Sequence, residues 1–216
     1  MLMLQVCLVF GQAGIQKKVL LIDPGHGGLD SGAVGINGIL EKEIVLNIAH
    51  EMLKLNHSLL NNEFDIYLTR YKDTLISLTD RTRLASNLNC DLFLSIHCNA
   101  SKTGAKGMEV FIHRSNVAYT ASSYKLAKSI LNESSLNLGL GQRGAKKANF
   151  QVLRETKAIC PSILIETGFI TNRDEAEYLK RTNKVRGMAL AILIGIYNYT
   201  KGGSLAKIKM SDNENK

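Results

Sequence analysis

The stretch LLIDPGHGGLDSGAVG, residues 20–35, passes from an apolar run directly into a glycine-rich turn. An apolar run that ends in Asp-Pro-Gly predicts a buried strand followed by a turn. His26 lies in this turn between two glycines. Either the glycines only supply backbone conformations with positive φ and the histidine is incidental, or the loop is bare so that another group can approach the imidazole closely, as at ligand and metal sites. The rest of the sequence decides between these interpretations.

Strand and helix patterns alternate along the remainder of the chain. Apolar runs predict strands at 19–22, 64–69, 91–97, 107–113, 150–153 and 162–166. Helical spacing of apolar residues and helix-start signals predict helices at about 41–55, 78–88, 119–131, 174–180 and 185–200. The stretch 132–149 is rich in Asn, Ser, Gly and Lys and is predicted to be a loop. This alternation is typical of an α/β domain with a largely parallel sheet.

Length and composition indicate one ordinary globular domain. The chain has 216 residues, of which 45% are hydrophobic and 21% charged, and its net charge is +8. A basic surface favours polyanions, which include nucleic acids, acidic cell-wall polymers and membrane surfaces. The sequence contains no RNP, zinc-finger or helix-turn-helix signature, so we expect no nucleic acid partner.

The two ends of the chain differ from the middle. Residues 1–14, MLMLQVCLVFGQAG, are apolar, uncharged and too short to span a bilayer. They resemble a secretory signal peptide, although such peptides have a Lys or Arg near the first residue and this stretch has none. A buried first strand is the alternative. Residues 202–216 have little to bury and are expected to be disordered. The structured domain is therefore expected to span residues 18–201.

The four cysteines do not form a convincing disulfide framework. Cys7 would leave with the signal peptide, so that three cysteines would remain. Cys90 and Cys98 bracket a strand-like run, which would hold them roughly 25 Å apart. A disulfide cannot bridge that distance, and we expect free thiols.

Polar side chains stand at the ends of three predicted strands. The first strand leads to Asp23 and His26, the strand at 91–97 ends at His97, and the strand at 162–166 ends at Glu166. Each residue alone has a structural explanation. Ligands of open α/β sheets, however, collect beyond the carboxyl ends of the strands, where these side chains would meet.

A fourth polar residue comes from the helix that opens at Glu41. Positions 44, 45 and 48, which share its helical face, are all apolar, whereas the face of Glu43 is mostly polar. Glu41 is therefore predicted to point inward. It either complements the positive end of the helix dipole or, as a buried carboxylate, needs a partner that a metal ion would supply.

His26, Glu41 and His97 together offer two imidazoles and one carboxylate. This is a ligand set for catalytic zinc with one position open to water. Glu166 remains as a carboxylate that is not a ligand, the usual general base for such a water. The chain has no HExxH helix, which argues against a thermolysin-type protease.

Other polar residues have less specific roles. Arg81 is expected to brace its helix through an ion pair rather than to bind substrate. Asn99 is equally well explained as a substrate contact and as the cap of a turn. Lys146 and Lys147 are expected on a solvated face that would favour anionic wall polymers.

Five blocks of sequence occur in the order of a known family. LLIDPGHGGLDSGAVG…EKEIVLNIA, TR…D…LTDRTRLAS, DLFLSIHCNAS, GMEVFIH and VLR…CPSILIETGFITNRDEAEYL resemble the zinc-dependent N-acetylmuramoyl-L-alanine amidases of bacterial cell-wall remodelling. The resemblance runs from about Val19 to Tyr199. It implies a single α/β domain with a twisted, mostly parallel sheet of about six strands flanked by helices.

The resemblance also implies an activity and a site. One Zn²⁺ per chain would be held by His26, Glu41 and His97, and Glu166 would be catalytic. The substrate would be peptidoglycan, cut at the amide bond between N-acetylmuramic acid and L-alanine. Such a protein would be exported to the periplasm or the cell wall. The rival interpretations are an amidase of free muropeptides and a catalytically silent wall-binding module, and the presence of all four site residues disfavours the second.

The sequence also suggests how the enzyme would be regulated. Some exported amidases of this family carry a long inserted helix that covers the zinc, after the strand equivalent to 107–113. Here only residues 114–149 separate that strand from the next predicted element, and one ordinary helix with a loop accounts for them. We therefore expect an enzyme that needs no activator. We also expect a monomer.

Overall fold

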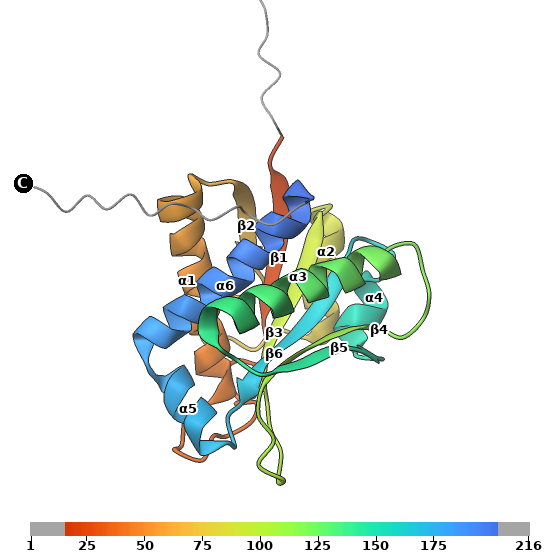
Figure 1. Cartoon of the computed structure of the whole chain (residues 1–216). Coiled ribbons are helices and arrows are strands. Elements are labelled where there is room, and N and C mark those ends of the chain that lie inside the picture. The colour runs from red at the N-terminus through yellow and green to blue at the C-terminus, as the bar shows by residue number, and fades with distance from the viewer. Residues whose placement is uncertain (1–15, 203–216) are drawn as a thin grey trace, which may run out of the picture.

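The computed structural model describes residues 16–202, which form one six-stranded sheet flanked by helices (Figure 1). The strand order is β2-β1-β3-β6-β4-β5. The strands are β1 (Lys18–Pro24), β2 (Phe64–Leu68), β3 (Leu92–Asn99), β4 (Met108–His113), β5 (Gln142–Ala148) and β6 (Ser162–Phe169). The helices are α1 (Glu41–Leu60), α2 (Leu78–Asn87), α3 (Thr120–Leu138), α4 (Gln151–Thr156), α5 (Arg173–Lys180) and α6 (Thr182–Lys201).

Strand direction changes once across the sheet. β2, β1, β3 and β6 are parallel, β4 runs antiparallel to β6, and β5 runs parallel to β4. The carboxyl ends of β1, β3 and β6 therefore share an edge of the sheet with the beginnings of β4 and β5. The α/β class and the mostly parallel sheet of six strands are confirmed.

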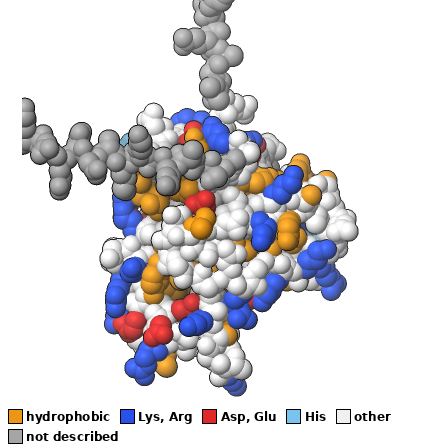
Figure 2. All heavy atoms as spheres, viewed as in Figure 1, with side chains coloured by type: hydrophobic (Ala, Val, Ile, Leu, Met, Phe, Trp, Pro, Cys, Tyr) orange, Lys and Arg blue, Asp and Glu red, His pale blue; other side chains and the backbone are white. Residues whose placement is uncertain are grey.

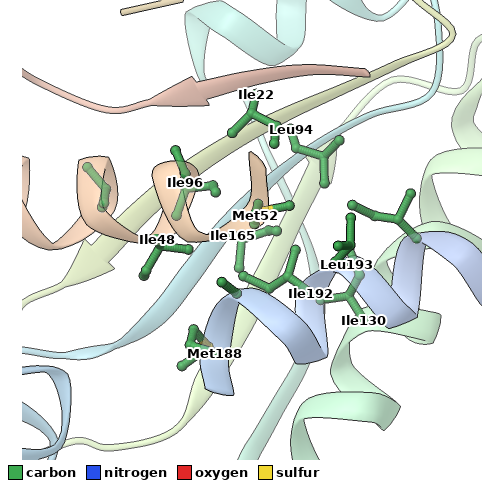
Figure 3. Packing of buried hydrophobic residues seen from close by; sticks show 14 of the residues in the cluster. Ile22, Ile48, Met52, Leu94, Ile96, Ile130, Ile165, Met188, Ile192 and Leu193 are labelled. Carbon is green, nitrogen blue, oxygen red and sulfur yellow. The ribbon is translucent and has the colours of Figure 1, made fainter. Parts of the chain in front are cut away.

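Apolar side chains cover both faces of the sheet. Strand residues alternate between the faces, so that Leu20 and Ile22 join the larger core cluster while Leu21 joins the smaller one. Helices α1, α3 and α6 close the larger core, part of which Figure 3 shows, and α2 and α4 close the smaller one. Burial of each large apolar side chain contributes about 1.5–3 kcal/mol, so this double-sided packing fixes the sheet from which the site is built.

Two predicted elements are wrong. The run 150–153 is not a strand but the start of α4, because a short apolar run does not distinguish a strand from a buried helical turn. The stretch 132–149 is not a loop, since α3 continues to Leu138 and β5 covers Gln142–Ala148. β5 is an edge strand with the sequence QRGAKKA, and charged, half-exposed edge strands lack the apolar alternation that predicts strands.

The cysteines that the structure describes are free. Cys90, Cys98 and Cys160 are all buried, and none forms a disulfide, as the sequence predicts for Cys90 and Cys98. Cys90 and Cys160 face each other in the smaller core, with 3.4 Å between their sulfur atoms. Residues 1–15 and 203–216, and with them Cys7, the proposed signal peptide and almost all of the proposed tail, lie outside the described residues.

The surface gives two further observations. Figure 2 shows Lys and Arg side chains scattered around the face formed by α1, α3 and α6, with acidic side chains among them. The positive net charge is therefore not gathered into one patch on this face. Within residues 16–202, none of the helices has the length and hydropathy needed to cross a membrane.

Candidate metal centre and active site

The site lies at the edge of the sheet where β1, β3 and β6 end. His26 lies two residues beyond the end of β1, and His97 and Glu166 are paired neighbours on β3 and β6. Glu41 is the first residue of α1. The structure thus brings all four residues predicted from the sequence to one edge of the sheet.

Three of these side chains form a compact group of donors. One ligand atom each from His26, Glu41 and His97 lies within 4.8 Å of the others. Nε2 of His26 is 3.1 Å and Nδ1 of His97 is 2.9 Å from Oε1 of Glu41. The two imidazole rings meet edge to face, with 4.9 Å between their centroids.

Glu41 is held as a buried carboxylate. It is 3% exposed whereas Glu43 is exposed, as helical phase predicts. The backbone N–H of Cys98 donates to Oε1 at 2.9 Å and that of Ala33 donates to Oε2 at 2.8 Å. Burial opposes ionisation, but the hydrogen bonds of His26 and His97 outweigh it and lower the pKa of Glu41 below its ordinary value. The group therefore contains a permanent negative charge.

His26 is oriented by a second carboxylate. Nδ1 of His26 lies 2.8 Å from Oδ2 of Asp30, so Nε2 is the ring nitrogen that faces Glu41. The hydrogen bond to Glu41 raises the pKa of the imidazole against the opposing effect of burial, and Asp30 adds to the rise. A carboxylate behind a histidine is the usual support of a metal ligand, because it fixes the ring and increases its basicity.

The glycines around His26 serve two different purposes. Gly27 and Gly28 have φ of 126° and 59°, and His26 itself has φ of 59°, so this turn needs left-handed backbone. Gly25 has no positive φ, but a Cβ there would lie 2.3 Å from Cε1 of the His97 ring. Gly27 and Gly28 therefore supply left-handed backbone, whereas Gly25 leaves room for a close approach, and the group that approaches is the ring of His97.

Two buried arginines tie this loop to the sheet. Arg81 donates to Oδ1 of Asp23 at 2.6 Å and to the carbonyl oxygens of Pro24 and His26. Arg70 donates to the carbonyl oxygens of Pro24 and Gly25. Arg81 does form an ion pair, but its partner Asp23 belongs to β1, so the pair ties α2 to the sheet and does not brace the helix alone. Both guanidinium groups hold the backbone that carries His26.

Glu166 lies beside the donor group without belonging to it. It pairs with His97 across the sheet on one side and with Glu109 of β4 on the other. Its Oε2 atom is buried and has no hydrogen-bond partner among the residues that the structure describes. Burial raises the pKa of the Glu166 carboxyl to about 8, and the nearby carboxylates Glu41 and Glu109 add to the rise.

The donor set fits zinc. Two imidazoles and one carboxylate are the protein ligands of many catalytic zinc sites, and they leave a coordination position open. The ionised state of Glu41 and the Asp30 support behind His26 are what such a site requires. The Glu166 carboxyl, with its raised pKa beside these donor side chains, is typical of a general acid or base.

The similarity to known proteins identifies the family. A profile of the family described as N-acetylmuramoyl-L-alanine amidase matches residues 20–198. The chain belongs to this family. Its members are peptidoglycan hydrolases, and zinc dependence is characteristic of them.

Individual amidases show the same relationship. The chain is 41% identical over 184 residues to the N-acetylmuramoyl-L-alanine amidase LytC of Bacillus subtilis, covering 84% of this chain and 35% of LytC. It is 37% identical over 199 residues to CwlM of Bacillus licheniformis, covering 89% of this chain and 74% of CwlM. It therefore spans about a third of LytC and three quarters of CwlM. The structure of the amidase AmiC2 of Nostoc punctiforme superposes with a TM-score of 0.77 at 35% identity, over 86% of this chain and 98% of that one.

Two parts of the candidate site were not predicted from the sequence. Asp30 was missed, although a carboxylate four residues after a turn histidine is a usable signal. Glu109 was missed because it stands at the beginning of a strand.

Asn99 donates from Nδ2 to Oε1 of Glu109, and its own Oδ1 accepts from the backbone of Ala100. Asn99 therefore both braces the turn and joins the polar group beside Glu166.

Proposed function

We propose that this chain hydrolyses the amide bond between N-acetylmuramic acid and L-alanine in peptidoglycan, using one zinc ion. One observation carries the proposal: the donor group of His26, Glu41 and His97 lies at the same edge of the sheet as Glu166, whose buried Oε2 has no hydrogen-bond partner among the described residues. Membership of the amidase family supports the substrate, and the chemistry of the donor set supports the metal.

In this proposal His26, Glu41 and His97 hold the zinc ion. When bound, zinc polarises the scissile carbonyl and lowers the pKa of the attacking water. Asp30 keeps the His26 ring in the orientation in which Nε2 faces the group. Arg70 and Arg81 keep the loop from shifting, which preserves the spacing of the ligands.

Glu166 moves the proton. Its carboxylate takes a proton from the attacking water and returns it to the nitrogen of the departing L-alanine. A carboxyl group whose pKa lies near neutral pH suits both transfers, because it exchanges a proton readily in either direction. Its unpartnered oxygen leaves an acceptor position available for the water.

Substitution of Glu166 tests these roles. We expect Glu166→Gln to keep one zinc per chain and a native melting profile but to lose about 10²–10⁴-fold of its turnover, because the amide accepts no proton at neutral pH. Glu41→Gln should lose zinc, whereas the matched exposed variant Glu43→Gln should change neither property. Elemental analysis and mass spectrometry of digested peptidoglycan provide the readouts.

The alternative outcomes of this experiment are distinct. A fully active Glu166→Gln protein would show that another group is the base. Loss of zinc from that variant would show that Glu166 is itself a ligand. Release of a product other than free stem peptide would contradict the proposed amide hydrolysis.

Export, a monomeric state and activity without an activator belong to the same proposal. The substrate lies outside the cytoplasm, and residues 1–14 have the composition of a signal peptide. Helix α3 packs with α6 against the larger core, on the side of the sheet opposite the Glu166 side chain. Helix α3 therefore does not cover Glu166, which supports activity without an activator. Protein from its host should begin near Gly14, and purified protein should digest sacculi without a partner.

A further inference from the structure

Beyond Glu166, a row of polar side chains continues across the sheet. His97 pairs with Glu166, Glu166 pairs with Glu109, and Glu109 pairs with Gly144 of the edge strand β5. Residues paired across neighbouring strands share a face of the sheet. Glu109 therefore lies on the face of the catalytic glutamate, one strand further from the donor group.

Glu109 is a buried anchor for two cations. It is 4% exposed, and its Oε2 accepts hydrogen bonds from Nε of Arg143 at 2.8 Å and from Nζ of Lys146 at 2.5 Å. Its Oε1 accepts from Asn99. Burial opposes ionisation of Glu109, but the bonds to Lys146 and Arg143 outweigh it and lower its pKa. One negative charge thus faces two positive charges, and the cluster keeps a net positive charge.

Arg143 is fixed in place yet accessible. Nε of its guanidinium is committed to Glu109, and the plane lies over the ring of Phe169 with 5.0 Å to the centroid. Neither terminal amino group of Arg143 donates to any residue in 16–202. The side chains of Arg143 and Lys146 are 37% and 40% exposed. The two terminal amino groups of this oriented guanidinium can donate two parallel hydrogen bonds, which matches the geometry of a carboxylate.

We propose that Arg143, assisted by Lys146, binds the free main-chain carboxylate of the second residue of the stem peptide. This inference rests on the proposed amidase function. In peptidoglycan the residue after L-alanine is a glutamate joined through its side chain, so that its main-chain carboxyl group is either free or amidated. The L-alanine carboxyl group is in a peptide bond, which makes this the first anionic group beyond the scissile amide.

The spacing of the row agrees with this assignment. Two residues of extended peptide span about 7 Å. Neighbouring strands lie about 4.8 Å apart, so Glu109 is one strand spacing from Glu166, and the Arg143 guanidinium lies next to Glu109. A substrate whose scissile amide lies at Glu166 therefore brings its second residue over the cation pair.

A matched pair of substrates tests the proposal. N-acetylmuramoyl-L-alanyl-D-glutamate and its D-isoglutamine counterpart differ only in carboxylate versus carboxamide at the group in question. Zinc-loaded wild-type protein should have the lower KM for the acid. Arg143→Gln should raise the KM for the acid by about 10–100-fold, the value of a charge-assisted pair, with kcat and the KM for the amide nearly unchanged.

Control variants separate recognition from structure. Lys147→Gln makes the same charge change as Lys146→Gln one position along β5, at an exposed residue on the other face of the strand. It should leave both KM values unchanged, whereas Lys146→Gln should raise the KM for the acid. Arg143→Lys should restore part of the preference for the acid, because it restores the charge without the fork.

Three results would overturn the inference. Equal KM values of the wild-type protein for acid and amide, or a parallel loss on both substrates in Arg143→Gln, would show that Arg143 and Lys146 only neutralise Glu109. In either case cleavage of both compounds would leave the proposed amidase function standing. If the zinc-loaded wild-type protein cleaves neither of the two compounds nor intact sacculi, the proposed amidase function is refuted, and the inference is refuted with it.

Discussion

Replacement of Gly25 by alanine isolates the contact on which the two-histidine site is built. An ideal Cβ at this position would lie 2.3 Å from Cε1, 2.5 Å from Nε2 and 2.7 Å from Nδ1 of His97. Ordinary contacts of a Cβ begin near 3.4 Å, so the ring must move by about 1 Å. The φ of Gly25 is not positive, and the substitution therefore adds no backbone strain.

A displacement of this size should weaken metal binding at the proposed zinc site. Functional groups need to be held within about 0.5 Å of their working geometry, and loss of even a supporting partner of a ligand lowers metal affinity by about 10–100-fold. We expect Gly25→Ala to weaken zinc binding by at least that range, about 1.4–2.7 kcal/mol, while the fold is retained. Competition with a chelator of known affinity measures the change.

A matched glycine provides the control. Gly141 has no positive φ, and the nearest atom to an added Cβ is 3.8 Å away. Gly141→Ala should therefore bind zinc as the wild-type protein does. Zinc affinity of Gly25→Ala within threefold of the wild-type value, with activity retained, would refute the argument that close packing of His97 requires glycine here.

Two further predictions concern stability. Arg81→Gln leaves the buried carboxylate of Asp23 without its ion pair and should lower the free energy of unfolding by about 3–5 kcal/mol in urea titrations, whereas Arg83→Gln, which removes an exposed pair, should change it by less than about 1 kcal/mol. In metal-free protein the pKa of Glu166 rises from 4.5 to about 8 on folding, so the folded state holds a proton that the unfolded state releases, and the free energy of unfolding should fall as pH rises between these values. Glu166→Gln should reduce that fall by about 3–5 kcal/mol, and an unchanged pH dependence would contradict the burial argument.

The residues that sequence reasoning found share a simple geometric signature. His26, His97 and Glu166 each follow an apolar run, and the carboxyl ends of parallel strands meet at one edge. Glu41 was found because helical phase separates an inward position from an outward one. These arguments need only the periodicity of the chain and the rule that parallel strands point the same way.

The residues that were missed depend on information that periodicity does not contain. Glu109 and Arg143 stand at the beginnings of strands, and they reach the site only because β4 is reversed. The direction of one strand in a sheet is decided by tertiary packing, not by local pattern. The polar side chains of β5 predict a loop, and the sequence predicts a solvated face for Lys146, although Lys146 pairs with the buried Glu109. Asp30 acts through His26 rather than alone.

The single reversal of strand direction also divides the residues of the candidate site between two parts of the polypeptide chain. His26, Glu41 and His97 lie before residue 100 and Glu166 lies on β6, whereas Arg143 and Lys146 lie on β5, within the continuous segment 108–148. That segment joins the rest of the sheet by one short ladder, β4 with β6. Helix α3 of the same segment packs against α6, so an exchange of residues 108–148 between family members would have to preserve that helix contact as well as the short ladder, while His26, Glu41, His97 and Glu166 stay in place.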